Sequence, residues 1–377
     1  MTGIVIIGSG LGGYSLAREL RRLDPAVAIT MVTADGGELY SKPMLSAAFA
    51  QGKDVQALAQ KTARQMEGEL GLTVVTRQRV TAIDRAAKRV VLGSGEAIAY
   101  GRLVLAMGAD PRPYRVEGSE EVTVHTVNDL DDYAAWRDGL VPQGRVLLIG
   151  AGLIGSEFAN DLTTAGQRVT VVDPAPWPLG RLLPRELGEE LATALGGIGV
   201  TFRLGRSITR LDPGKAVLDD GSVVAFDKAL SAIGLVPRTA LAAAGGLVVD
   251  KGIVVDRWLR TSDPAIFALG DCAQTEAGPL PFVLPLMAEA KALAATLAGR
   301  ETALSLPALP VVVKTPALPV AVCPPVPGAT GEWVVSGEGR DRKALFVGAD
   351  GQPLGFALSG SFTAERQPLA KEMPDLL

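Results

Sequence analysis

The sequence of 377 residues predicts an α/β fold with two similar halves and a smaller C-terminal part. Apolar runs at 4–7 and 146–149 each lead directly into a Gly-x-Gly-x-x-Gly pattern, and a helical pattern follows each glycine pattern. A second apolar run and a hairpin pattern then appear in both halves in the same order. This repeated β-α-β order predicts two Rossmann-like, three-layer ββα nucleotide-binding domains.

In the first half, strands are expected at 28–32, 72–75, 90–92 and 103–105. The first helix should run from about residue 14 to 23, where Asp24-Pro25 ends it. The second half repeats the plan with strands at 169–172 and 229–233 and a hairpin at 217–224 through Asp219-Asp220-Gly221-Ser222.

Pro-rich, strand-like pieces begin near residue 307, and a helical pattern lies near 365–371. These features predict a small C-terminal α+β domain. We expect one nucleotide-binding domain made of 1–110 and 236–305, a second nucleotide-binding domain at 111–235, and the C-terminal domain at 306–377.

Each glycine pattern predicts a pyrophosphate site. Its first glycine allows a tight turn, its second lets the backbone approach the phosphates, and its third lets the helix pack on the strand. The phosphates then lie at the helix N-terminus, where free N–H groups favour negative charge. An acidic residue follows at the distance expected for a ribose-binding carboxylate, Asp35 in the first half and Asp173 in the second. The plain alternative for both acids is a solvated turn residue.

Composition excludes several other classes of protein. A net charge of −4 gives no reason to expect nucleic acid or an anionic membrane as partner. No run of about 18 uncharged apolar residues is present, because Glu289 and Lys291 interrupt the best candidate at 279–298. The first strand begins so early that we expect no signal peptide. With only Cys272 and Cys323, we expect a cytoplasmic protein without a disulfide framework.

The ordered set of motifs resembles the FAD-dependent pyridine nucleotide-disulfide oxidoreductases related to glutathione reductase. Besides the two glycine patterns, it includes Tyr40-Ser41-Lys42-Pro43, the segments closing at Gly108 and Gly234, and the apolar strand that ends in Gly270-Asp271. The resemblance covers nearly the whole chain. It implies that the first half holds FAD and the second holds NADH.

The resemblance also implies which residues contact the cofactors. For FAD these are Gly8, Ser9, Gly10, Leu11, Gly12, Gly13, Thr33, Ala34, Asp35, Lys42, Pro43, Val80, Ala106, Gly108, Glu157, Asp271, Val283 and Lys314. For NADH they are Gly150, Gly152, Leu153, Ile154, Gly155, Asp173 and Gly234. Asp173 favours NADH over NADPH, since a carboxylate repels the 2′-phosphate of NADPH. The alternative for Asp271 is a helix cap.

Glu157 and Lys42 are the predicted catalytic residues, because in the resembled family a glutamate at this place reaches the flavin and pairs with a basic side chain. Lys42 is the expected partner of Glu157. Lys314 is expected to stabilise negative charge on the flavin. If the family resemblance is set aside, the sequence predicts for Glu157 only a glutamate at the start of a helix, and for Lys42 and Lys314 only solvent-exposed loop lysines. The single histidine, His125, is expected to be structural, and no metal site is predicted.

The two cysteines are 51 residues apart and form no Cys-x-x-Cys pair, so electrons are expected to leave the flavin directly. The loop at 40–47 and the segment at 313–319 resemble the NADH:rubredoxin reductase branch, which implies rubredoxin, a small iron protein, as the electron acceptor. That activity could support alkane hydroxylation. Alternatives are a ferredoxin or flavorubredoxin reductase, an NADH oxidase-like flavoprotein, and a flavin sensor without turnover. A monomer or weak dimer is expected.

Overall fold

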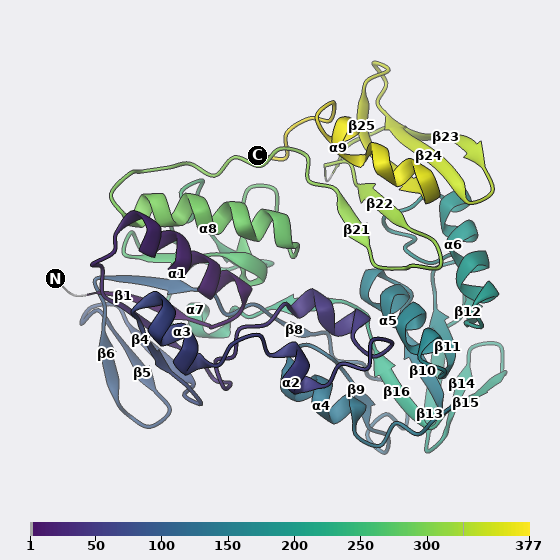
Figure 1. Ribbon diagram of the computed structural model, residues 1–377, viewed down its shortest axis with the longest axis horizontal. Helices are drawn as coiled ribbons and strands as arrows, with labels where there is room; N and C mark the ends of the chain where they lie inside the picture. Colours follow the sequence, from purple (N-terminus) through teal and green to yellow (C-terminus); the bar gives the residue numbers. More distant parts are fainter. Residues whose placement is uncertain (1–2, 327) are drawn as a thin grey trace.

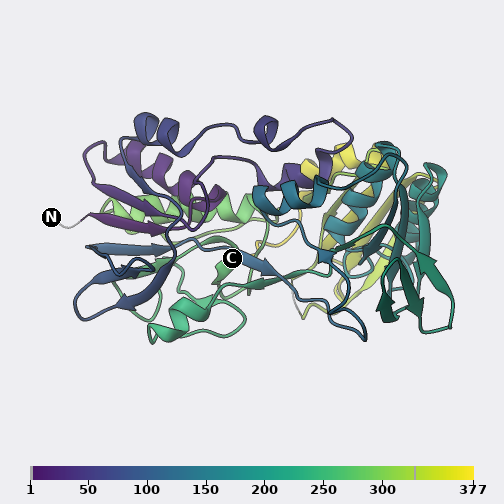
Figure 2. The same cartoon turned by 90° about the horizontal axis from the view of Figure 1, so that it is seen from below.

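The computed structural model describes residues 3–326 and 328–377, which form three parts (Figure 1). Two α/β parts lie side by side, and a third part formed by the last strands lies against the second (Figures 1 and 2). Each α/β part has a five-stranded parallel sheet with helices on it and a separate three-stranded antiparallel sheet. The predicted fold class is therefore confirmed.

The first parallel sheet has the strand order β19-β7-β1-β2-β3. Its strands are β1 (Ile4–Ile7), β2 (Ile29–Val32), β3 (Thr73–Val75), β7 (Arg102–Leu105) and β19 (Ile266–Ala268). Helices α1 (Leu11–Leu23) and α8 (Val283–Leu297) pack against each other beside this sheet (Figure 1). The antiparallel sheet consists of β4 (Val80–Asp84), β5 (Arg89–Leu92) and β6 (Ala97–Ala99). Helix α1 begins three residues earlier than predicted, since Gly10 is its N-cap.

The second parallel sheet has the order β12-β11-β10-β16-β9. Its strands are β9 (Val124–His125), β10 (Arg145–Ile149), β11 (Arg168–Asp173), β12 (Thr201–Leu204) and β16 (Lys228–Ser231). Helices α5 (Leu153–Thr164) and α6 (Arg185–Gly197) belong to this part. Its antiparallel sheet is β13 (Ile208–Asp212), β14 (Lys215–Leu218) and β15 (Val223–Ala225), so the predicted hairpin is present.

The C-terminal part is a five-stranded antiparallel sheet that packs on α6. Its strands are β21 (Val311–Val313), β22 (Val320–Cys323), β23 (Glu332–Glu338), β24 (Asp341–Val347) and β25 (Pro353–Ser359). A 3₁₀ turn, η3 (Gly360–Glu365), and the short helix α9 (Arg366–Ala370) follow. Strand β21 is shorter than the predicted run, because Pro310 and Pro316 flank it and proline cannot donate to a sheet.

The remaining elements connect these layers. They are η1 (Lys42–Ala47), α2 (Val55–Leu58), α3 (Ala63–Leu70), β8 (Ala109–Pro111), α4 (Leu130–Arg137), β17 (Leu235–Pro237), α7 (Ala240–Ala244), β18 (Ile253–Val254), η2 (Gly270–Cys272) and β20 (Ala273–Gln274). Strands β8 and β17 belong to the two chain segments that connect the α/β parts. They pair antiparallel, so these two connecting segments lie side by side.

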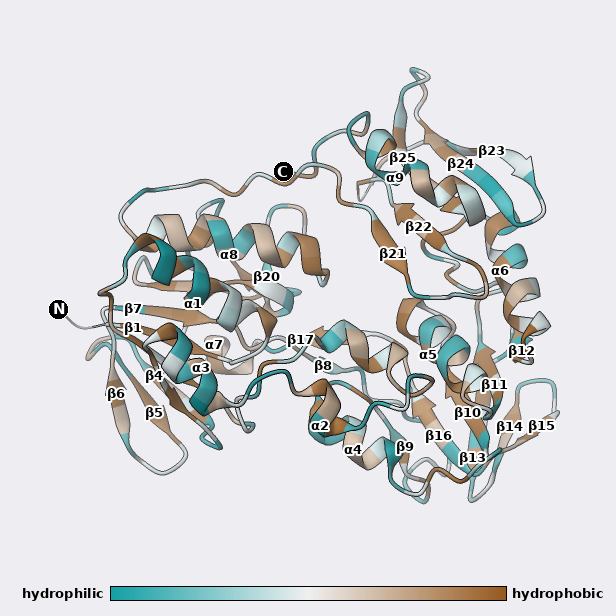
Figure 3. Cartoon of the chain, viewed as in Figure 1, coloured by the Kyte–Doolittle hydropathy of each residue, from teal (hydrophilic) through white to brown (hydrophobic). Residues whose placement is uncertain are grey.

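Hydrophobic residues concentrate on the central strands, whereas α1 and α3 include hydrophilic residues (Figure 3). Every residue of β1 is buried, as expected for a parallel sheet covered on both faces. Within the described residues, no helix is long and apolar enough to cross a membrane.

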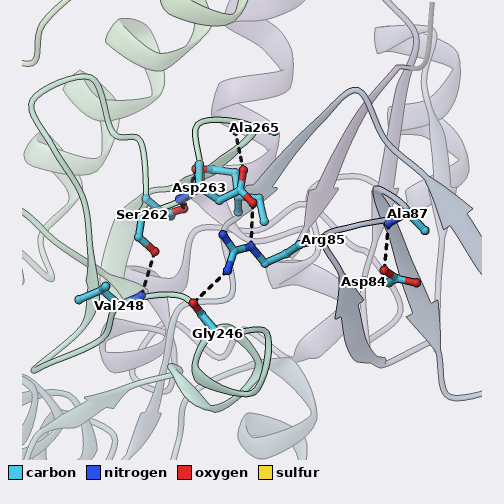
Figure 4. A network of polar contacts seen from close by, with 10 residues as sticks. Asp84, Arg85, Ala87, Gly246, Val248, Ser262, Asp263 and Ala265 are labelled. Carbon is cyan, nitrogen blue, oxygen red and sulfur yellow. Dashed lines mark hydrogen bonds and ion pairs between the residues drawn. The ribbon is translucent and has the colours of Figure 1, made fainter.

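Arg85 links the first antiparallel sheet to a segment far along the chain (Figure 4). Its Nε donates to Asp263 at 2.7 Å and its Nη1 to the carbonyl of Gly246 at 3.1 Å. Asp263 in turn accepts from the backbone N–H of Ala265 at 2.9 Å. Arg85 and Asp263 are 178 positions apart in the sequence, so this network connects the N-terminal and the later segment of the first α/β part.

We expect Arg85→Ala to lower the free energy of unfolding by about 1–2 kcal/mol, because Asp263, whose side chain is 16% exposed, loses its cationic partner. Urea unfolding measures the change. Arg89→Ala, in a more exposed pair with Asp84, is the matched control and should cost less than about 0.5 kcal/mol. Equal losses in the two variants would contradict the prediction.

Candidate functional site

A single cleft of about 1870 Å³ runs between the two α/β parts. Pockets for one small molecule are usually about 300–1000 Å³, so this cleft has room for more than one such ligand. Of the predicted site residues, those that line it are Gly8, Ser9, Gly10, Leu11, Gly12, Thr33, Ala34, Asp35, Lys42, Pro43, Val80, Ala106, Gly108, Gly150, Gly152, Leu153, Ile154, Glu157, Asp173, Gly234, Asp271, Val283 and Lys314. Gly13 and Gly155 are the two that do not.

In the first glycine loop, glycine is needed at each of the three positions for a different structural reason. Gly8 has a φ of +111°, and a Cβ there would lie 2.2 Å from the carbonyl oxygen of Ala106. A Cβ on Gly13 would lie 2.1 Å from the carbonyl oxygen of Gly8, so this glycine serves the packing of α1 on β1. A Cβ on Gly10 would meet no atom of the described residues within 4 Å. The open side of Gly10 faces the cleft, where a ligand can approach the backbone.

The second glycine loop repeats this geometry. Gly150 has a φ of +103°, and a Cβ on Gly155 would lie 2.0 Å from the carbonyl oxygen of Gly150. Gly152 is the N-cap of α5, and within the described part of the chain a Cβ there would meet nothing within 4 Å. The cleft therefore presents two helix N-termini, each with a backbone left open for an anion.

The two predicted ribose acids differ in how their oxygens are used. Oδ1 of Asp35 accepts hydrogen bonds from Ser9 (3.1 Å), Thr33 (2.5 Å) and the backbone of Gly37 (3.0 Å). Its Oδ2 accepts none from the residues that the structure describes. In Asp173 both oxygens accept backbone hydrogen bonds, from Ala151 at 2.6 Å and from Ala175 at 2.7 Å, which leaves one lone pair on each.

Asp271 and Lys42 lie at the first end of the cleft. Burial raises the pKa of Asp271, and the positive charge of Lys42 partly opposes that rise. Burial likewise lowers the pKa of Lys42, while Asp271 opposes the shift. The two side chains thus favour each other's charged forms.

Glu157 has a basic partner, but it is not Lys42. Its side chain, on the second turn of α5, is 0% exposed. Oε2 accepts hydrogen bonds from Nζ of Lys314 and from Oγ of Ser46 at 2.5 Å, and Oε1 accepts from the backbone N–H of Lys314 at 2.9 Å. The predicted Glu157–Lys42 pair is wrong. The lysine comes instead from the loop after β21, in the C-terminal sheet that packs on α6.

Two further polar residues of α5, Asn160 and Asp161, also bind neighbouring loops through hydrogen bonds. The sequence did not lead us to predict a role for either. Asp161 accepts from the backbone N–H groups of Phe49 (2.8 Å) and Ala50 (3.0 Å), and Asn160 accepts from that of Ala317 (3.0 Å). Residues i, i+3 and i+4 of a helix share one face, so this spacing was a usable signal. One face of α5 therefore fixes the loop after η1 and the loop that carries Lys314.

Neither the two cysteines nor the histidine lines the cleft. Cys272 and Cys323 are free, buried and packed in different apolar clusters. Burial raises the pKa of both thiols, that of Cys272 to about 12 and that of Cys323 to about 11, so neither thiol ionises at neutral pH. The His125 ring packs edge-on against Trp136 with centroids 5.6 Å apart. Over the described residues, no cluster of three or more His, Cys, Asp or Glu side chains suits a metal ion.

Comparison with known proteins gives two family matches. Residues 2–292 match the family model "Pyridine nucleotide-disulphide oxidoreductase", and residues 303–373 match "Rubredoxin binding C-terminal domain". The chain is 44% identical to a rubredoxin-NAD(+) reductase of Alcanivorax borkumensis, with all of both chains covered. It is 39% identical to a nitric oxide reductase FlRd-NAD(+) reductase of Aeromonas salmonicida, over 98% of this chain and 96% of the relative.

Among solved structures, a covalent putidaredoxin reductase–putidaredoxin complex contains a chain that superposes with a TM-score of 0.89 at 26% identity. The match covers 99% of this chain and 94% of that one. The family match spans most of the chain, and a protein of this family is expected to have the two glycine loops that line the cleft. The chain is a member of the pyridine nucleotide-disulphide oxidoreductase family that carries a rubredoxin-binding-type C-terminal domain.

Proposed function

We propose that this protein is an FAD-dependent NADH:rubredoxin oxidoreductase that takes electrons from NADH and delivers them singly to rubredoxin. The observation that carries the proposal is the single cleft that presents two glycine loops, one from each α/β part. Two dinucleotides held in one cleft can bring their reactive rings together without a protein acid or base between them.

The residues at the first loop fit FAD. Gly10 leaves its backbone open, the helix α1 directs its N-terminus at the cleft, and Asp35 keeps Oδ2 available for a ribose hydroxyl. Asp271 and Lys42 would hold the remaining part of the cofactor. Bound FAD supplies the ability to accept two electrons together and release them one at a time. NADH would bind at Gly150, Gly152, Leu153, Ile154, Asp173 and Gly234, whereas Gly155, which does not line the cleft, would serve the packing of α5 against the loop.

The chain's own residues position the reactants. The Glu157–Lys314 pair holds one carboxylate and one ammonium at the point where both α/β parts and the C-terminal sheet meet. Its hydrogen bond with Ser46 fixes η1, which begins at Lys42. Lys314 itself is 30% exposed, so its charge also faces the cleft.

We propose the predicted domain boundaries as well: 1–110 with 236–305 for FAD, 111–235 for NADH, and 306–377 for the acceptor. Support comes from β19, which joins the first sheet beside β7, and from the paired crossings β8 and β17. Cys272 and Cys323 do not pair, which supports a reducing, cytoplasmic location.

Rubredoxin as acceptor is supported by the C-terminal family match and by the 44% identical rubredoxin-NAD(+) reductase. The Aeromonas relative favours a second candidate, the rubredoxin-like centre of a flavorubredoxin. Interfaces between redox partners are small and transient, so turnover is a better criterion than affinity.

Anaerobic stopped-flow spectroscopy tests the proposal. NADH should bleach the flavin absorbance of the purified holoprotein, and rubredoxin added next should restore it while becoming reduced. Ferredoxin, a flavorubredoxin and oxygen are the comparison acceptors. A flavin that NADH does not bleach refutes the proposal, and faster reoxidation by oxygen than by rubredoxin points to an oxidase.

Asp173→Asn should narrow the preference for NADH over NADPH by about tenfold in kcat/KM, roughly 1.4 kcal/mol. The amide removes the charge that repels a 2′-phosphate and keeps one of the two backbone hydrogen bonds. The other acceptor becomes an NH2 group, so kcat/KM should fall with both coenzymes and the charge effect is read from their ratio. Arg181 and Arg206 line the same end of the cleft and would then face that phosphate. Steady-state kinetics with both coenzymes measures the ratio. An unchanged ratio would show that Asp173 does not select the coenzyme.

A further inference from the structure

Glu289 is a buried carboxyl group to which the proposed reaction gives no role. It lies in the middle of α8, and its side chain is 2% exposed. Its Oε2 accepts a hydrogen bond of 2.6 Å from the backbone N–H of Gly270. The charged group of the described residues that acts on it is Asp271, which carries the same sign.

Gly270 is the residue that sets the position of Asp271. It opens the 3₁₀ turn η2 with a φ of +71°, directly after strand β19. Both Gly270 and Asp271 line the cleft. The hydrogen bond from Gly270 to Glu289 therefore ties the turn that carries Asp271 to the neighbouring helix.

A hydrogen-bond acceptor at this place does not have to be ionisable. The amide oxygen of a glutamine would accept the same N–H group, and burying a neutral amide costs less than burying a carboxylate. The chain nevertheless places a carboxyl group here, on the buried face of a helix whose other charged residue, Lys291, is exposed. What the carboxyl group adds over an amide is the ability to gain and lose a proton.

The surroundings of Glu289 place that proton exchange near neutral pH. Burial raises the pKa of Glu289 to about 7, and the charge of Asp271 adds to the rise while the Gly270 hydrogen bond opposes it. From η2 it faces Asp271 and the Cys272 thiol, whose own pKa of about 12 keeps it neutral. From α1, Ser15 contacts α8 at Met287 and carries no charge.

We propose that Glu289 is a positioning residue of the FAD site that also sets the charge of this site by exchanging a proton. In both protonation states it fixes Gly270, and with it Asp271. Only the ionised state adds a second negative charge beside Asp271. Negative charge near an electron acceptor lowers its midpoint potential, since the field opposes electron uptake. The inference rests on the proposed FAD site.

Redox titration of bound FAD over about pH 5.5 to 8.5, in wild type and Glu289→Gln, tests the proposal. The two midpoint potentials should coincide at acidic pH and diverge above about pH 7, with the wild type lower. Glu289→Gln should bind FAD within about twofold of wild type, whereas Glu289→Leu should bind it about tenfold more weakly, because Gly270 loses its acceptor. Glu276→Gln, an exposed change of the same charge, is the control and should change neither quantity.

Urea unfolding of the holoprotein gives a second readout. The folded protein holds a proton on Glu289 that the unfolded chain has lost, so wild type should lose stability relative to Glu289→Gln as pH rises from about 4.5 to about 7. A potential difference that stays constant with pH, or normal FAD binding by Glu289→Leu, overturns the inference alone, provided that NADH still bleaches the flavin. A wild-type protein that binds no FAD overturns both the inference and the proposed function.

Discussion

Gly10→Val is expected to yield a folded protein that purifies without flavin. The affinity for FAD should fall at least about 100-fold, roughly 2.7 kcal/mol, because the side chain fills the space through which a pyrophosphate reaches the N-terminus of α1. Gly10 has a φ of −62°, which valine adopts without strain, and a Cβ there touches nothing in the described residues. The cost to the apoprotein is the poorer helix cap, about 1 kcal/mol. Flavin absorbance and equilibrium dialysis measure the binding.

Gly152→Val is the matched variant in the second loop, with a φ of −70° and the same open surroundings. It should retain FAD, which dithionite still reduces, but its KM for NADH should rise by about 100-fold. The two variants thus separate the two sites. Loss of FAD in Gly152→Val, or normal FAD in Gly10→Val, would reverse or refute the assignment of the loops.

Of the second parallel sheet, the sequence predicted β10, β11 and β16 but missed β9 and β12, which are short and carry polar residues. It predicted every strand of the first sheet, because these strands are short apolar runs and the glycines that follow β1 have local roles. Gly8 and Gly13 show why: each is required by a carbonyl oxygen of its own loop or of the neighbouring strand. Element ends were less predictable. The run around β21 is cut short by Pro310 and Pro316, and α1 begins three residues before its predicted start, whereas α9 matches the predicted last helix within one residue at each end.

The residues of the predicted site came together in one cleft, but their pairing could not be read from the sequence. Lys42 was the expected partner of Glu157 because the resembled family pairs this glutamate with a basic side chain and Lys42 was expected beside the flavin. The actual partner, Lys314, is 157 residues away from Glu157 and is brought there by the C-terminal sheet packing on α6. Glu289 was noticed only as an interruption of an apolar run, since its meaning depends on Gly270 in the folded chain.

Lys314→Met is expected to lower the free energy of unfolding by about 2–4 kcal/mol, because it leaves the fully buried Glu157 carboxylate without a cation. Glu157→Gln should cost less, about 1 kcal/mol, since Lys314 is 30% exposed and water can solvate the ammonium. Both variants should also slow the bleaching of the flavin by NADH, because the pair fixes η1 and the loop after β21.

The double variant Lys314→Met with Glu157→Gln should be more stable than the sum of the single losses predicts, by about 1–3 kcal/mol. Urea unfolding of all four proteins measures this coupling. Additive losses, or a larger loss in Glu157→Gln than in Lys314→Met, would contradict a buried carboxylate held by Lys314. In that case Asn160 and Asp161 would hold the loop after β21 and the loop after η1 to α5. Their side chains accept hydrogen bonds from backbone N–H groups of these loops, and these contacts involve no ion pair.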